Sequence, residues 1–451
     1  MAKNKTIYVC QECGYESIKW VGKCPSCNQW NTMVEEIKES KPKKITNIPL
    51  KNSAKSIENI KSGEYDRLDT GIEELNRVLG GGIVKGSLTL ISGAPGIGKS
   101  TLLLQTANNI ATKYGKILYV SGEESEEQIK MRGNRLKAVC SDIYILSETN
   151  IDLIKKHIED INPKFVIVDS IQTLFKESLS SAPGSVSQVR ECSNDLMIMS
   201  KTKNIPLFIV AHVTKQGQLA GPRVLEHMVD AVLTFEGQRT EEYRILRTVK
   251  NRFGTTSEIG VFEMNEVGLV EINNPSAAFL EDSDMQKEGS VVIGVMEGTR
   301  PILVEVQALV SETKAYMPRR TAIGIDNSRL SLILAVLEKK LKIPFYNCDV
   351  YVNVVGGLDV VGTFADLGLA LALISSIKSK EVTIPSLLVT GEIGLTGEVR
   401  PVSFCDRIVN EGIKMGFNNI LIPNRNKNRI EGKNANIIGA ESLREIVKKV
   451  F

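Results

Sequence analysis

The sequence predicts an α/β protein built on a mostly parallel sheet, with a small cysteine-rich segment before the sheet and an α+β domain after it. Short apolar strands alternate with helical patterns between about residues 65 and 275, as a parallel sheet covered by helices on both faces requires. Four cysteines fall within the first 27 residues, and strands rich in β-branched residues return after residue 285. Since 451 residues are too many for one hydrophobic core, we expect two or three domains.

Charge and hydropathy narrow the classes of protein. The net charge is only +3, so any affinity for nucleic acid must come from local clusters of basic residues. No apolar run reaches the roughly 18 residues that span a bilayer, and the first residues lack the apolar segment of a secretory signal. We therefore expect a cytoplasmic protein that does not bind a membrane.

A glycine-rich loop that matches G-x-x-x-x-G-K-[ST] follows the apolar strand 88–91. The backbone N–H groups of such a loop surround an anion, and the next helix adds the positive end of its dipole. We expect the loop and the start of the helix to bind ATP through Gly93, Ala94, Pro95, Gly96, Ile97, Gly98, Lys99, Ser100 and Thr101. Lys99 would reach the β- and γ-phosphates, and Ser100 would contact Mg²⁺.

The ends of three apolar strands near this loop supply further candidates. Asp169 is expected to be a second Mg²⁺ contact, through water. Glu123, nearest the strand end, is placed to polarise the attacking water. Glu124 is the alternative for this role, although an acid there also suits the start of the next helix. His212 either senses the γ-phosphate or caps a turn.

Two C-x-x-C pairs separated by ten residues fit a tetrahedral Zn²⁺ site, and the four ligands would be Cys10, Cys13, Cys24 and Cys27. The metal would supply the folding energy that about 30 residues cannot obtain from a core, with Tyr8, Trp20 and Trp30 as the available apolar packing. A redox pair or two disulfides are the alternatives. Lys19, Lys23 and Trp20 suit contact with either nucleic acid or protein.

The lysine-rich stretch that follows, from Lys38 to Lys61, is a basic linker that serves as a tether or tracks a phosphate backbone.

Further along the chain, the strand 243–249 runs into the pentapeptide K-N-R-F-G. Its two cations, Lys250 and Arg252, are one residue apart and therefore point the same way. They suit the γ-phosphate of a neighbouring subunit, as an arginine finger does. An exposed basic turn is the alternative.

Together these motifs resemble the bacterial RadA (Sms) family of DNA repair and recombination proteins over essentially the whole chain. The resemblance implies a RecA-like P-loop ATPase that assembles as a homohexamer and hydrolyses ATP. It also implies movement on single-stranded and branched DNA, branch migration alongside the RecA recombinase, and contact between the zinc finger and RecA. By analogy with RecA-like motors, the DNA contacts would be Lys215, Gln216, Arg223, Lys250 and Arg252.

The segment 390–402 resembles the proteolytic domain of Lon, which uses a serine activated by a lysine. Phe364 and Asp406 fall at the positions of that serine and lysine, and neither can perform the missing task. We therefore expect a scaffold for ring assembly and DNA contact, not a protease. The predicted domains are a four-cysteine zinc finger (1–36), a basic linker (37–62), a RecA-like P-loop ATPase (63–275) and a Lon-protease-like domain without the dyad (276–451).

The leading hypothesis from the sequence is an ATP-driven DNA helicase or branch-migration factor whose ATPase is stimulated by DNA. The missing dyad argues against an ATP-dependent protease. The zinc finger and the pentapeptide argue against a clock-like signalling ATPase. An adaptor with a degenerate nucleotide site is disfavoured because the expected catalytic residues are intact, namely Lys99, Ser100, Glu123 and Asp169.

Overall fold

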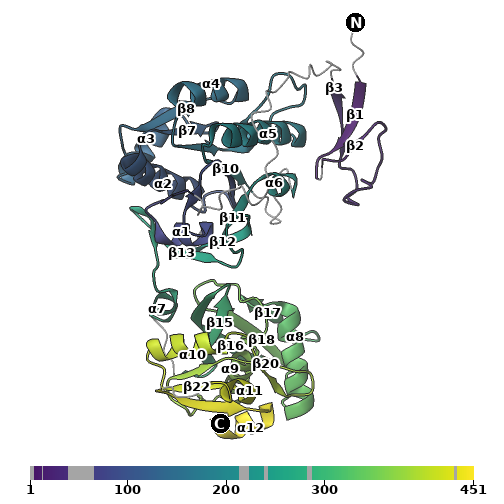
Figure 1. Cartoon of the computed structure of the whole chain (residues 1–451). Helices are drawn as coiled ribbons and strands as arrows, with labels where there is room; N and C mark the ends of the chain where they lie inside the picture. Colours follow the sequence, from purple (N-terminus) through teal and green to yellow (C-terminus); the bar gives the residue numbers. More distant parts are fainter. Residues whose placement is uncertain are drawn as a thin grey trace, which may run out of the picture. The chain divides into compact units, whose positions relative to one another are not determined.

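The computed structural model describes residues 5–12, 14–38, 66–212, 223–237, 242–281, 287–430 and 434–451. Contacts within the chain define two compact units (Figure 1). The first comprises Met1–Glu236, Leu246–Thr256 and Met264–Glu271, and the second comprises Gly237–Ile245, Ser257–Glu263 and Ile272–Phe451. Among the described residues, no helix has both the length and the apolar composition needed to cross a membrane.

The N-terminal ribbon is a small antiparallel sheet with the strand order β2-β1-β3. Its strands are β1 (Lys5–Cys10), β2 (Glu16–Ser17) and β3 (Met33–Lys38). The buried core consists of Cys10, Cys24 and Met33. The expected packing by Trp20 and Trp30 is wrong, because these side chains are 56% and 68% exposed.

The central element of the first unit is a nine-stranded sheet with the order β14-β13-β12-β11-β6-β10-β9-β7-β8. The strands from β11 to β8 in this order pair in parallel. The strands are β6 (Leu88–Gly93), β7 (Ile117–Ser121), β8 (Ile143–Ser147), β9 (Phe165–Asp169), β10 (Leu207–His212), β11 (Ala231–Glu236), β12 (Tyr243–Asn251), β13 (Ile259–Asn265) and β14 (Gly268–Glu271). A two-stranded ladder precedes them, formed by β4 (Arg67–Leu68) and β5 (Ile83–Val84).

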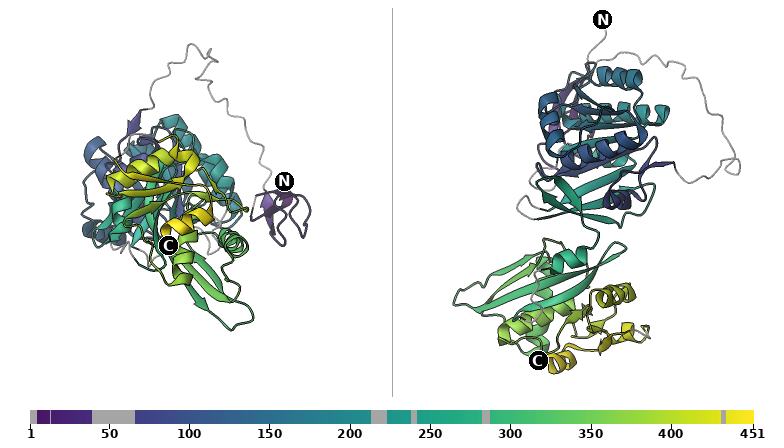
Figure 2. Two further views of the ribbon diagram at one scale, coloured as in Figure 1. Left: turned by 90° about the horizontal axis from the view of Figure 1, so that it is seen from below. Right: turned by 90° about the vertical axis from the view of Figure 1, so that its left-hand side faces the viewer.

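Helices cover both faces of this sheet (Figure 2). They are α1 (Glu73–Leu79), α2 (Lys99–Tyr114), α3 (Glu126–Arg135), α4 (Ile151–Ile161), α5 (Val186–Lys203) and α6 (Arg223–Met228), with a 3₁₀ turn at Ile171–Thr173. Every residue of β6, β7 and β9 is buried, which is the pattern of parallel strands covered on both faces. The predicted α/β class is therefore confirmed.

The second unit is built on a seven-stranded mixed sheet with the order β17-β18-β16-β15-β19-β22-β23. Its strands are β15 (Ser290–Glu297), β16 (Arg300–Glu312), β17 (Arg320–Ile323), β18 (Cys348–Val354), β19 (Leu387–Val389), β22 (Asn419–Pro423) and β23 (Asn436–Ala440), with a small hairpin of β20 (Glu392–Ile393) and β21 (Val399–Arg400) beside them. The helices are α7 (Pro275–Leu280), α8 (Asn327–Val336) with a π-helical end (Leu337–Leu341), α9 (Asp366–Lys378), α10 (Cys405–Lys414), α11 (Asn424–Lys427) and α12 (Leu443–Val450).

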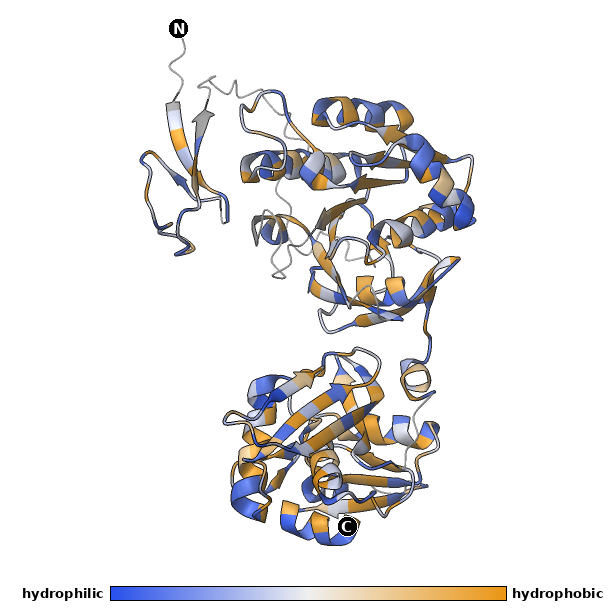
Figure 3. Ribbon diagram, turned by 180° about the vertical axis from the view of Figure 1, so that it is seen from behind, coloured by the Kyte–Doolittle hydropathy of each residue, from blue (hydrophilic) through white to orange (hydrophobic). Residues whose placement is uncertain are grey.

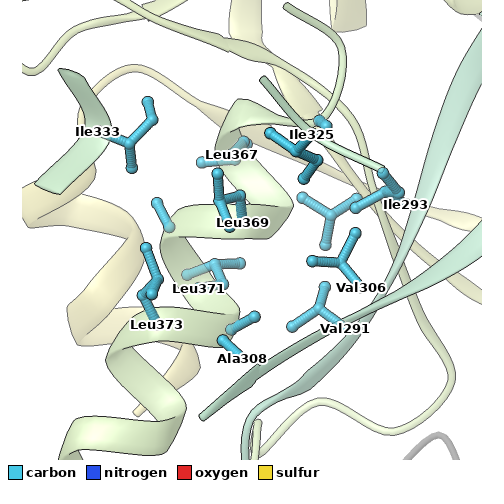
Figure 4. Packing of buried hydrophobic residues seen from close by; sticks show 14 of the residues in the cluster. Val291, Ile293, Val306, Ala308, Ile325, Ile333, Leu367, Leu369, Leu371 and Leu373 are labelled. Atoms are coloured by element: carbon cyan, nitrogen blue, oxygen red, sulfur yellow. The ribbon is translucent and has the colours of Figure 1, made fainter. Parts of the chain in front are cut away.

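Helix α9 is the centre of the core of this unit. All residues from Asp366 to Ser376 are buried, and the leucines of α9 lie against Val291, Ile293 and Val306 of the sheet (Figure 4). A Cβ on Gly368 would lie 2.1 Å from Ile293 Cγ2, so glycine allows the helix to lie close to β15. Hydrophobic residues follow the strands of both sheets (Figure 3).

Candidate functional site

The phosphate loop joins the end of β6 to the start of α2, as the motif predicted. The ammonium of Lys99 turns back onto the loop, and its Nζ donates to the carbonyl oxygens of Gly93 (2.8 Å) and Ala94 (2.9 Å). Gly98 has φ +120°, and a Cβ there would lie 2.8 Å from Met264 Cε. The backbone conformation therefore favours glycine at this position, and a larger residue would also have to displace the methyl end of Met264.

Lys99 is only 4% exposed, and this burial determines its protonation. Burial lowers the pKa of Lys99 to about 8, although the carboxylates of Asp169 and Glu123 act in the opposite direction. A buried cation beside a loop of backbone N–H groups favours an anion strongly, because a phosphate would offset the lost hydration.

Asp169 lies at the end of β9 and meets Ser100 from the first turn of α2. Ser100 Oγ donates to Asp169 Oδ2 at 2.5 Å, and the hydroxyl of Tyr119 donates to the same oxygen at 2.8 Å. Burial, with Asp169 beside it, holds the pKa of Tyr119 well above its ordinary value, so the hydroxyl remains a donor that orients the carboxylate. A serine hydroxyl and a carboxylate are oxygen ligands that suit Mg²⁺.

The two neighbouring glutamates have different surroundings. Glu123 Oε1 accepts a hydrogen bond from Ser170 Oγ at 2.5 Å, and Glu123 interacts electrostatically with Lys99. Glu124 instead forms an ion pair with Arg132. The expectation that Glu124 begins the next helix is wrong, because α3 starts at Glu126 behind a capping box formed by Ser125.

The structure gives the backbone positions of some of the remaining predicted residues but does not describe the others. The backbone of His212 pairs with Gly93 in the parallel register of β10 and β6, so His212 ends its strand beside the loop. Thr101 lies in the first turn of α2. Arg223 begins α6. The predictions for Cys13, Lys215 and Gln216 lie outside the described residues.

Lys250 and Arg252 are held by contacts within their own chain. Lys250 Nζ donates to the carbonyl oxygens of Glu226 (2.6 Å) and Val229 (2.8 Å), where it caps the C-terminal end of α6. Burial and the nearby Arg252 lower the pKa of Lys250. Arg252 NH1 lies 3.2 Å from Asp230 Oδ1, and the Arg252 side chain remains 56% exposed.

Asp230 fixes the position of this pair relative to the phosphate loop. Its buried carboxylate accepts hydrogen bonds from the N–H of Leu88 (3.1 Å) and from Lys201 Nζ (2.7 Å). Leu88 is the first residue of β6, whereas the loop follows the last residue, Gly93. At about 3.3 Å per residue, these ends are roughly 16 Å apart. The two cations therefore lie at the sheet edge opposite their own phosphate loop.

The other members of the pentapeptide attach it to the end of α1. Asn251 Nδ2 donates to Leu79 O at 3.2 Å, and Arg67 NH2 donates to Phe253 O at 2.8 Å. A Cβ on Gly254 would lie 3.2 Å from the Cα of Gly80. Together these contacts fix the backbone of the pentapeptide against the turn that follows α1.

Three of the four predicted zinc ligands come together in the ribbon. The Sγ atoms of Cys10, Cys24 and Cys27 all lie within 4.8 Å of one another, and Cys10 and Cys27 are 3.6 Å apart. Thiolates are preferred ligands of Zn²⁺ in structural sites. The donor set therefore fits zinc.

Comparison with known proteins identifies the family. A DNA repair protein RadA of Halalkalibacterium halodurans is 52% identical over 430 residues, which cover 94% of each chain. This chain belongs to the RadA family of DNA repair proteins. Its RadA relative from Bacillus subtilis is 49% identical over 99% of both chains. The RadA of Listeria monocytogenes is also 49% identical, over 100% of this chain and 99% of its own.

Family models match three parts of the chain. Residues 54–218 match the AAA domain, residues 8–35 match the rubredoxin metal binding domain, and residues 320–426 match subunit ChlI of Mg-chelatase. A solved KaiC-like protein from Pyrococcus horikoshii aligns with 46% of this chain and 99% of its own, at 21% identity and a TM-score of 0.38. RadA membership and the AAA match support ATP hydrolysis, and the ribbon match with its cysteine cluster supports Zn²⁺.

The two residues that the sequence motif aligns with the Lon dyad lie at the starts of two helices. Phe364 comes just before α9, and Asp406 lies in the first turn of α10. The nearby buried Asp366 is paired with Arg329 and accepts a hydrogen bond from the N–H of Ile393. This carboxylate is therefore engaged in holding the fold.

Several contributors to these sites were missed by sequence reasoning. Tyr119, Ser170, Arg67 and Asp230 lie far along the chain from the groups that they contact. Of these four residues, only Asp230 could have been predicted from its neighbours in the sequence. It directly precedes an apolar strand, so its side chain is expected where that strand enters the sheet.

Proposed function

We propose that this chain is a DNA-dependent ATPase that forms a homohexameric ring, moves on single-stranded DNA and drives branch migration of recombination intermediates. The observation that carries the proposal is the place of Lys250 and Arg252, at the sheet edge opposite the phosphate loop of their own chain. An exposed guanidinium so far from its own nucleotide suits the nucleotide of a neighbour.

Within one subunit, the loop from Gly93 to Thr101 binds the phosphates of ATP, and Lys99 contacts the β- and γ-phosphates. Ser100 and Asp169 would hold Mg²⁺, and the bound ion would neutralise phosphate charge. Glu123 orients the attacking water, and its contact with Ser170 favours it over Glu124 for this role. His212 senses the γ-phosphate from the end of the adjacent strand.

Between subunits, Arg252 contacts the γ-phosphate of the neighbour, and Lys250 links this group to the DNA contacts. Lys250 caps α6, and Arg223 at the start of α6 is a proposed DNA contact together with Lys215 and Gln216. A shift of α6 on DNA binding would therefore act on Lys250, which is two residues from Arg252. This connection gives DNA a physical route to the rate of hydrolysis.

The remaining parts of the chain have supporting roles. The zinc finger (1–36), whose assignment is supported by the match of residues 8–35, contributes to contact with the RecA recombinase. The Lon-like domain (276–451) supports ring assembly. These boundaries, with the linker at 37–62 and the ATPase domain at 63–275, are part of the proposal.

Steady-state ATP hydrolysis with and without single-stranded DNA tests this function. We expect DNA to stimulate ATP hydrolysis by the unaltered chain. Lys250→Ala should lose this stimulation but still bind nucleotide, whereas Lys99→Ala should lose both the stimulation and the binding of nucleotide. Lys203→Ala is the matched control, because it removes a lysine that pairs with Glu159 and leaves the contacts of Asp230 and of the pentapeptide in place. Hydrolysis that is indifferent to DNA in the unaltered chain would refute the motor.

Mixed assemblies test the action between subunits. Arg252→Ala supplies an intact phosphate loop and Lys99→Ala supplies an intact Arg252, so mixing the two inactive variants should restore part of the activity. If no mixture recovers activity, although both variants co-assemble, the arginine does not act on a neighbour.

A further inference from the structure

The ribbon carries the only two tryptophans of the chain, and both are on its surface. The sequence contains two tryptophans, Trp20 at 56% exposure and Trp30 at 68%. Tryptophan is buried on average, and large exposed apolar groups mark interaction sites. The ribbon core is made by cysteines and Met33 instead, so packing within the ribbon does not explain these two residues.

Both indole rings lie beside Gly22. A Cβ at this position would lie 3.5 Å from Trp20 Cη2 and 3.8 Å from Trp30 Cζ3, so a side chain there would contact both rings. The two segments that carry the rings are joined by a bridge between Lys23 and Trp30 and by a 2.8 Å hydrogen bond from Asn31 N–H to Gly22 O. The rings are therefore mounted on one connected piece of backbone.

The charges around the rings are positive. Lys23 Nζ lies 5.8 Å from the centre of the Trp30 ring, and Lys19 directly precedes Trp20. From Ser17 to Val34 the chain has two lysines and no acid. The ribbon's acids lie outside this stretch, at Glu12, Glu16, Glu35 and Glu36.

We propose that this face of the ribbon binds single-stranded DNA, with Trp20 and Trp30 stacking on bases while Lys19 and Lys23 contact phosphates. Aromatic faces interleaved with cations are the chemistry by which proteins hold unpaired bases without sequence preference. A protein partner of opposite charge would also suit the lysines, but it would not require two exposed indole rings beside one glycine. This contact lies outside the ATPase part and does not depend on the ATP coupling proposed above.

Intrinsic fluorescence gives a direct readout in the full-length chain. Because both tryptophans are in the ribbon, all tryptophan emission reports on this face. Titration with an oligothymidylate of about 20 nucleotides should quench the emission to saturation, whereas blunt duplex DNA, whose bases are already stacked, should not. Affinity for the same labelled oligonucleotide is measured in parallel by fluorescence anisotropy.

Variants separate stacking from simple attraction of charges. Trp20→Ala and Trp30→Ala should each weaken binding roughly five- to 100-fold, and Trp20→Phe should restore much of the affinity. Gly22→Val, which adds carbon atoms in contact with both rings, should reduce quenching. Tyr316→Ala is the control, because this fully exposed aromatic is in the second unit. Unchanged zinc content shows that each variant retains its metal.

The proposal is overturned if the oligonucleotide leaves the emission unchanged at saturation, or if Trp20→Ala and Trp30→Ala bind it as the unaltered chain does. Quenching only by a protein such as the RecA recombinase would assign the face to protein docking and overturn it as well. If DNA quenches the emission but does not stimulate ATP hydrolysis, the motor is refuted and the ribbon site is supported. If DNA stimulates hydrolysis but does not quench the emission, only the ribbon site is refuted.

Discussion

Protonation of Lys99 should make nucleotide binding depend on pH. Burial lowers the pKa of this lysine to about 8, and a bound triphosphate supplies the negative charge that should return it to its ordinary value of about 10.4. The bound state then holds the proton more tightly than the empty one. Binding therefore takes up a proton above pH 8, and the affinity falls as the pH rises.

The size of the effect follows from the two pKa values. At pH 8.5 about three quarters of the empty sites lack the proton, so binding should take up roughly 0.7 proton. Between pH 7 and pH 9 the affinity should fall about tenfold. Calorimetry with a non-hydrolysable ATP analogue and Mg²⁺, in buffers of different ionisation enthalpy, measures both quantities.

Lys99→Arg is the matched control, because a guanidinium stays protonated throughout this range. The uptake at pH 8.5 should disappear in this variant, even where its affinity is lower. Equal uptake by the variant and the unaltered chain would assign the proton to another group. Absence of uptake in the unaltered chain would refute the role of burial described here.

Three further predictions concern the pentapeptide and the second unit. Asp230→Asn removes the charge that orients Arg252, so DNA-stimulated hydrolysis should fall at least tenfold while ATP affinity, measured by calorimetry, is retained. Gly254→Ala places a methyl group 3.2 Å from the Cα of Gly80, and this overpacking should cost about 1–3 kcal/mol, seen as a lower melting temperature. Phe364→Ser should produce no peptide cleavage in a fluorogenic assay, because Asp406 provides no general base equivalent to lysine.

The parts of the site that the sequence predicted are local in the chain. Strand, loop and helix follow one another within the phosphate loop, and α2 runs from Lys99 to Tyr114 as its pattern indicated. Asp169 and Glu123 were found because apolar strands end at these acids. Such assignments need only the rule that parallel strands end at one edge of the sheet.

The parts that were missed depend on packing between distant segments. The hydroxyl of Tyr119 reaches Asp169 because β7 and β9 are neighbours in the sheet. The sequence of neither strand predicts which strand pairs with it. The two tryptophans were expected inside the ribbon because indoles are large and apolar. The cysteines occupy that space instead, since a ribbon of this size has room for little else.

Segments of the two units alternate along the chain between residues 237 and 272, and this limits where the chain can be cut into separate domains. Ile245, Ile259 and Val261 precede the last segment of the second unit in sequence, yet they belong to its hydrophobic core. A truncation after residue 275 would leave these three side chains in water, at roughly 1.5–3 kcal/mol each, and the separated C-terminal fragment would have gaps in its interior. Exchange of C-terminal domains between relatives, in the laboratory or by gene fusion, should therefore give sound proteins only when residues 237–245 and 257–263 are transferred with them.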